Sequence, residues 1–165
     1  MRLRASAAAA AAVLVIAAAA VHPAAQDADQ KVANGGILVK GWQGRADAGK
    51  QGLTVNDSRF AAEGKGFRLT TGPAAFYWNP ANTGKGDYTA RATFREPKQT
   101  YTHPHPFGVF IGGRALDTDA PSALYCVAYR NGNYLVRMFS EGKVVQVSGK
   151  PAPHDAVRKA GGPEA

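Results

Sequence analysis

The sequence predicts an all-β protein, built as a two-sheet antiparallel sandwich of the jelly-roll type. Short apolar segments of strand length follow one another after residue 36, separated by Gly, Asn, Asp and Pro. No apolar stripe of helical period appears after the first 25 residues. Many short strands at this spacing are typical of a sandwich or a barrel. The predicted strands are 37–42, 59–63, 66–71, 74–78, 88–95, 107–111, 123–130, 134–140 and 143–148.

The first 25 residues have the pattern of a secretory signal peptide. Arg2 and Arg4 precede an apolar run over residues 7–20, and small residues follow, so cleavage after Ala20 or after Ala25 fits equally well. The run of about 14 residues is shorter than the roughly 20 that span a bilayer. We therefore expect a secreted or periplasmic protein with no stable membrane insertion after signal removal. No Cys lies near the cleavage region, which argues against a lipid anchor.

The charge and the cysteine content restrict the possible partners. Cleavage after Ala25 would remove two arginines and no acid, which lowers the net charge from +8 to +6. The remaining basic residues form separate short clusters rather than one dense block, so no nucleic-acid partner is expected. The single Cys126 cannot form an internal disulfide, and stability must therefore come from the core.

The mature chain is long enough for one domain. We expect a flexible lead-in over residues 26–36, which are polar and small, a β-sandwich domain over 37–150, and a tail or truncated remainder over 151–165. About 140 residues are sufficient for a single domain with a real core.

Residues 123–148 predict a meander of three strands. Asn131-Gly132 is a strong signal for a type I′ hairpin turn, which would pair Val127 with Val136 and Tyr125 with Met138. A second turn at Glu141-Gly142 would continue the pairing and place Val145 opposite Met138 and Val147 opposite Val136. The predicted core face is then Tyr125, Val127, Tyr129, Tyr134, Val136, Met138, Val145 and Val147. The opposite face mixes polar and apolar side chains, with Arg137 beside Gln146, and such a surface suits a ligand.

The segment 88–95 alternates in the manner of a strand with one wet face. Tyr88, Ala90, Ala92 and Phe94 are predicted to point inward, while the Thr and Arg residues between them point to solvent.

Several segments carry a family resemblance: Gly41-Trp42, 72–80 (GPAAFYWNP), 88–94 (YTARATF), His103-Pro104, 108–113 (GVFIGG) and 131–137 (NGNYLVR). In this order they resemble secreted bacterial proteins with the concanavalin A-like lectin/glucanase fold, closest to the keto-disaccharide hydrolase domain group. The resemblance spans roughly residues 41–159. It implies a jelly roll that handles carbohydrate on its concave face. It also implies further strands beyond residue 159, so it predicts a chain truncated at its C-terminus.

Five residues are predicted to bind a saccharide: Tyr77, Trp78, Asn79, Arg137 and Gln146. Aromatic rings offer flat apolar faces to a pyranose, and planar amide or guanidinium groups hydrogen-bond its hydroxyls. Neighbours on a strand point to opposite faces, so we expect one of Tyr77 and Trp78 in the core and the other on the ligand surface.

The candidate catalytic residues are His103, His105 and Asp117. His-x-His directs both imidazoles the same way, but no third ligand follows at metal spacing, so neither a metal nor another cofactor is predicted. A rigid loop flanked by prolines is the simpler interpretation of that segment. Glycoside hydrolysis usually needs two carboxylates roughly 5 to 9 Å apart, and the nearest sequence pair, Asp117 and Asp119, lies in an expected loop. Cys126 is predicted to be a buried, inert thiol.

Three functions remain open from the sequence. The first is an exported carbohydrate-binding protein that recognises a saccharide on a concave sheet face. The alternative is a glycoside hydrolase acting on a (keto-)disaccharide or glycan, and its acid or base would be one of the three catalytic candidates. The third is a non-catalytic structural protein of the envelope. The missing carboxylate pair favours binding, and the enzyme label of the resembling group favours hydrolysis.

Overall fold

The computed structural model describes residues 31–47, 52–96 and 106–157. These residues form ten β-strands and short 3-10 turns, among them Val55–Asp57, which confirms the predicted all-β class. No helix within these ranges is long and apolar enough to cross a membrane. Ordered structure extends beyond the predicted domain at both ends, because one strand starts at Gly36 and another ends at Pro153.

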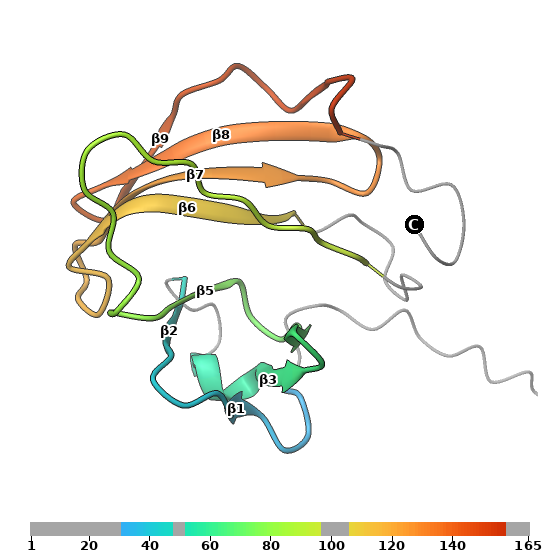
Figure 1. Cartoon of the computed structure of the whole chain (residues 1–165), viewed down its shortest axis with the longest axis vertical. Coiled ribbons are helices and arrows are strands. Elements are labelled where there is room, and N and C mark those ends of the chain that lie inside the picture. The colour runs from blue at the N-terminus through green and yellow to red at the C-terminus, as the bar shows by residue number, and fades with distance from the viewer. Residues whose placement is uncertain (1–30, 48–51, 97–105, 158–165) are drawn as a thin grey trace, which may run out of the picture.

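A five-stranded antiparallel sheet forms one side of the molecule (Figure 1). β7 lies between β6 and β8, and both β9 and β10 pair with the other edge of β8. Its strands are β6 (Phe107–Arg114), β7 (Ser122–Ala128), β8 (Asn133–Ser140), β9 (Lys143–Gln146) and β10 (Ala152–Pro153).

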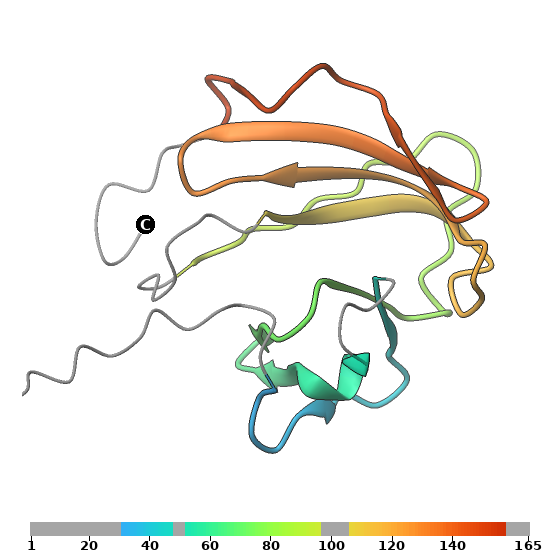
Figure 2. The ribbon, with the colours of Figure 1, turned by 180° about the vertical axis from the view of Figure 1, so that it is seen from behind.

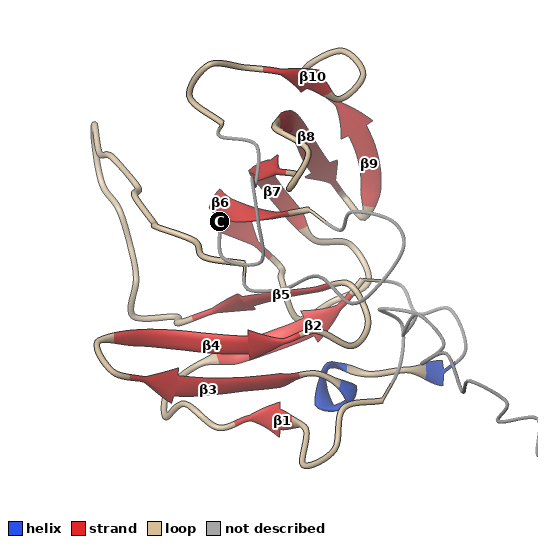
Figure 3. Cartoon of the chain, turned by 90° about the vertical axis from the view of Figure 1, so that its right-hand side faces the viewer, coloured by secondary structure: helices blue, strands red, loops and turns tan. Residues whose placement is uncertain are grey.

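The other five strands form the opposite side (Figure 3). β1 pairs in parallel with β3, which pairs antiparallel with β4, while β2 and β5 form a two-stranded ladder. They are β1 (Gly36–Ile37), β2 (Gln43–Ala46), β3 (Arg59–Glu63), β4 (Gly66–Thr70) and β5 (Ala75–Trp78). The single strand predicted at 37–42 is wrong. A turn divides it, since Trp42 N–H donates to the Val39 carbonyl and Gly41 has a φ of +80°.

The two layers face each other (Figure 2), and aromatic side chains pack between them. Phe76 on β5 contacts Phe110 and Phe139 of the large sheet, with ring centroids 6.0 and 5.6 Å away. The other side of β5 carries Tyr77, which stacks on Phe60 at 4.7 Å. Because neighbouring residues of β5 point to opposite sides, Phe76 packs on the large sheet while Tyr77 packs within the other layer. The face of the large sheet that Phe76 contacts is called the inner face below, and the opposite one the outer face.

A second aromatic cluster lies within the smaller layer. Trp42 contacts Phe60 at 5.1 Å and Phe67 at 4.8 Å, and the ring of Phe60 is 6% exposed. Beside this cluster, Thr54 begins the 3-10 turn in a capping box with Asp57. The Thr54 hydroxyl accepts from the Asn56 N–H, and the Thr54 N–H donates to the Asp57 carboxylate at 2.7 Å.

The predicted Asn131-Gly132 register is wrong by one residue. Tyr129 N–H donates to Asn133 O and Gly132 N–H to Tyr129 O, and of these loop residues only Gly132 has a positive φ, +90°. That is a three-residue loop closed by a bulge, not a type I′ turn. Cys126 consequently pairs with Val136, and Val127 with Leu135.

A one-residue slip moves side chains to the other face, so the predicted core face is divided. Tyr125 and Val127 belong to the inner face together with Leu135, the most buried large side chain at 1% exposure. Val136 and Met138 lie on the outer face. The type I′ geometry occurs instead at Glu141 and Gly142, with φ values of +50° and +80°. The predicted pairs across that turn, Val145 with Met138 and Gln146 beside Arg137, are confirmed.

The strand predicted at 88–95 is also wrong. These residues pair with no strand among those described, and Tyr88 and Phe94 are about half exposed. Alternating apolar and polar residues indicate an extended segment with one side toward apolar neighbours. Such a segment can exist without backbone hydrogen bonds to another strand, so the alternation alone does not predict a strand.

Candidate functional site

The best-formed polar site is a cross-strand row on the inner face of the large sheet. Phe110 on β6 lies opposite Tyr125 on β7, which lies opposite Arg137 on β8, and Arg137 lies opposite Gln146 on β9. Such directly opposed residues bring their Cβ atoms to about 4.5 to 5.5 Å. The row runs from an aromatic side chain that contacts the other layer to an exposed amide, and we call Tyr125, Arg137 and Gln146 the polar row.

Hydrogen bonds fix the exposed end of the polar row. Arg137 Nε donates to Gln146 Oε1 at 2.9 Å, and Gln146 Nε2 donates to the Gly149 carbonyl. The Gln146 side chain is therefore held at both ends, and it orients the guanidinium by its Nε. A fixed, planar group of this kind presents its remaining N–H donors in defined directions.

Tyr125 connects the row to the aromatic contact between the layers. Its ring is 5.2 Å from that of Phe139, which also contacts Phe76. Burial raises the pKa of the Tyr125 hydroxyl, while its hydrogen bond with Arg137 and the charge of that residue oppose the rise, and the carboxylate of Asp47 adds to it. The phenol therefore remains protonated at neutral pH and can donate a hydrogen bond.

β5 contributes the facing surface. Trp78 follows Phe76 at a spacing of two, and their ring centroids are 6.2 Å apart, so both lie on the side of β5 that meets the large sheet. On the same side of the β2–β5 ladder, Arg45 lies opposite Phe76 and reaches Asp119, with 3.4 Å between Nη2 and Oδ1. The structure thus places Trp78 and the polar row on facing surfaces of the two layers.

Tyr77 and Asn79 have structural surroundings. The Tyr77 ring packs on Phe60, next to Gly44, where a Cβ atom would lie 2.8 Å from Tyr77 Cδ1. Burial raises the pKa of the Tyr77 hydroxyl, and the nearby Ser58 hydroxyl partly offsets that rise, although no hydrogen bond of standard geometry joins them. Asn79 Oδ1 accepts from the Ala81 N–H at 2.9 Å and so closes a turn after β5.

Ser58 is the buried polar residue that positions the approach to β5. It is 1% exposed, its Oγ accepts from the Gly72 N–H at 3.0 Å and donates to the Pro73 carbonyl at 3.5 Å. One hydroxyl thus satisfies two backbone groups of the segment that leads into the Phe-Tyr-Trp strand.

Only one of the three catalytic candidates, Asp117, lies among the described residues. His103 and His105 lie outside the described residues. Asp117 is exposed in the loop between β6 and β7, as predicted, and Asp119 of the same loop pairs with Arg45. Among the residues that the structure describes, no three His, Cys, Asp or Glu side chains are grouped to hold a metal ion.

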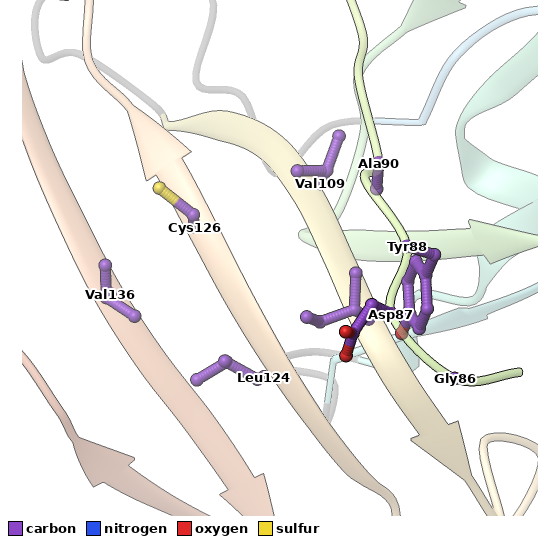
Figure 4. A pocket seen from close by; sticks show the side chains of 9 residues that line it. Gly86, Asp87, Tyr88, Ala90, Val109, Leu124, Cys126 and Val136 are labelled. Carbon is purple, nitrogen blue, oxygen red and sulfur yellow. The ribbon is translucent and has the colours of Figure 1, made fainter. Parts of the chain in front are cut away.

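An open groove crosses the outer face (Figure 4). It encloses about 440 Å³, and its floor is apolar side chains of β6, β7 and β8 while residues 86–90 form one wall. Its lining includes Cys126, which is exposed, so the predicted buried thiol is wrong. Cys126 alternates along β7 with Tyr125 and Val127 of the inner face, so it lies on the outer face, which no second sheet covers among the described strands.

Sequence reasoning singled out Arg137, Gln146 and Trp78, but it placed Tyr125 in the core and put Arg137 and Gln146 on the opposite face, whereas the structure has Tyr125, Arg137 and Gln146 on one face. No local sequence signal could have found it, because Asn-Gly fits a two-residue loop as well as the bulged one, and Tyr125 lies opposite Arg137 only in the bulged register. In the comparisons with known proteins, no family model, curated protein or solved structure matches this chain.

Proposed function

We propose that this chain is an exported carbohydrate-binding protein with a β-sandwich of the concanavalin A-like jelly-roll type, and that a saccharide binds between Trp78 and the polar row. The observation that carries the proposal is the oriented pair of Arg137 and Gln146 on the face that also meets β5. The sequence resemblance and the signal-like leader support the fold type and the export.

The chemistry of the polar row suits a sugar ring. A pyranose has apolar C–H faces and a rim of hydroxyls that both donate and accept hydrogen bonds. Trp78 offers a flat apolar surface, while Arg137 and the protonated Tyr125 offer donors, and Gln146 offers both an acceptor and donors. We propose binding rather than cleavage, because glycoside hydrolysis usually needs a pair of carboxylates. Among the described residues, the only two acids close together in the sequence are Asp117 and Asp119. Both lie in an exposed loop, and Asp119 is paired with Arg45.

Calorimetric titration with a panel of neutral and acidic oligosaccharides tests the site. Arg137→Ala and Trp78→Ala are each expected to weaken binding at least tenfold, since each removes a contact at the proposed ring position. Arg91→Ala is the matched control, because it also removes one positive charge, from an exposed residue that lies outside the polar row.

The outcomes separate the possible functions. Weakened binding in Arg137→Ala with unchanged binding in Arg91→Ala supports the site, provided that both variants melt within a few degrees of the wild type. Equal binding in all variants would place the sugar elsewhere. No binding to any glycan would refute the proposal, and product formation from a bound glycan would show hydrolysis instead.

A further inference from the structure

The free edge of β6 lies next to an extended segment of the same chain. β6 pairs with β7 along one edge, and among the described strands none pairs with its other edge. An unpaired edge leaves a row of backbone N–H and C=O groups available to another strand. Residues 88–94 run beside this edge, and Figure 4 shows Ala90 next to Val109 of β6.

The contacts define a direction and a register. Phe94 packs on Phe107 at the start of β6, with ring centroids 5.3 Å apart, while Tyr88 and Ala90 share the groove with Val109 and Ile111 farther along β6. The segment therefore runs antiparallel to β6. If Phe94 lies opposite Phe107, then Ala92 lies opposite Val109 and Ala90 opposite Ile111.

The sequence of the segment agrees with this register. Its apolar residues alternate with Thr89, Arg91 and Thr93, so a paired strand would put the apolar set on the outer face beside Val109 and Ile111. Gly86 precedes the segment with a φ of +64°, a left-handed conformation that glycine adopts without strain and that gives the segment a pivot.

We propose that residues 88–94 are a strap that closes onto the free edge of β6 as an additional antiparallel strand, with Phe94 opposite Phe107. The structure holds the strap in an open state, attached by its side chains and without a backbone ladder to the described part of β6. Closing would extend the large sheet by one strand, cover the edge of β6 and bring Tyr88 and Ala90 beside the outer-face residues of the groove.

Paired cysteines test the register. In a Cys126→Ser background, which removes the native thiol opposite Val109, Ala92→Cys with Val109→Cys is expected to form a disulfide in most molecules under mild oxidation. The control pair, Thr93→Cys with Val109→Cys, moves one thiol by a single residue to the other face, and we expect little cross-link. Mass spectrometry of peptides quantifies both.

Absent cross-linking in the Ala92/Val109 pair, or equal cross-linking in the two pairs, would overturn the proposal. If the cysteine variants do not fold, hydrogen exchange on the unmodified protein tests independently whether residues 88–94 pair with β6. Amides of residues 88–94 are expected to exchange at least tenfold more slowly than those of an unstructured chain, and exchange at the unstructured rate would refute closure.

Discussion

The face on which Leu135 lies makes the sharpest prediction. The bulged turn at Gly132 puts Leu135 on the inner face, 1% exposed, and leaves its neighbour Val136 half-buried on the outer face. The alternative type I′ turn would reverse these roles. Truncating each residue to Ala therefore measures the register in solution.

The expected costs differ severalfold. Leu135→Ala removes three buried carbon atoms, which is about 2.4 kcal/mol of lost transfer free energy at roughly 0.8 kcal/mol per buried methylene. A cavity that does not collapse raises the loss in the free energy of unfolding to about 3 to 5 kcal/mol. Val136→Ala removes two half-buried carbons, so we expect a loss of about 1 kcal/mol or less.

Urea unfolding, monitored by far-ultraviolet circular dichroism, measures both losses in the free energy of unfolding. The slope of this free energy against urea concentration should be the same in all variants, which excludes a change in the unfolded state. Leu135→Val serves if the Ala variant has no folded baseline, and it should lose about 1 kcal/mol. A larger loss for Val136→Ala than for Leu135→Ala would show that Val136 is the core residue and that the bulged turn is incorrect.

Two further predictions concern the smaller layer. Gly44→Ala should lose about 1 to 3 kcal/mol of stability, because the added Cβ would lie 2.8 Å from Tyr77 and 2.9 Å from Ile37; thermal melting checks this, and an unchanged melting temperature would mean that Tyr77 does not pack there. The backbone hydrogen bond from Thr54 holds the pKa of Asp57 below its ordinary value, so its stabilising effect is present above the unfolded pKa of about 3.9 and is lost as the pH falls through the folded pKa. Asp57→Asn should therefore be less stable than wild type at pH 6 and should converge with it below about pH 3; a difference that persists in acid would refute the capping role.

Strand positions followed from the sequence more reliably than pairings did. The strand 59–63 was predicted with its observed bounds, and the last hairpin with its pairs, because apolar runs and Gly-containing turns are local signals. The register of β7 and β8 was not predictable from the same signals. Asn-Gly fits either a two-residue loop or a bulged one, and only tertiary burial of Leu135 distinguishes them.

The same difference between local and long-range signals decides which parts of the candidate site could be predicted from the sequence. Arg137 and Gln146 were predicted side by side because they flank a short turn, and that pair is observed. The approach of β5 to the inner face involves residues far apart in the chain, such as Phe76 and Phe139, and no periodicity within one strand encodes it.

The two tryptophans stand on opposite sides of the packing that joins the layers. Trp42 lies within the aromatic cluster of the smaller layer, and Trp78 faces the large sheet. Two variants that each keep only one tryptophan would therefore report, by fluorescence, on the smaller layer and on the contact with the large sheet separately. Their fluorescence transitions would coincide if the layers unfold as one cooperative unit, and would separate if the large sheet survives after the smaller layer has melted.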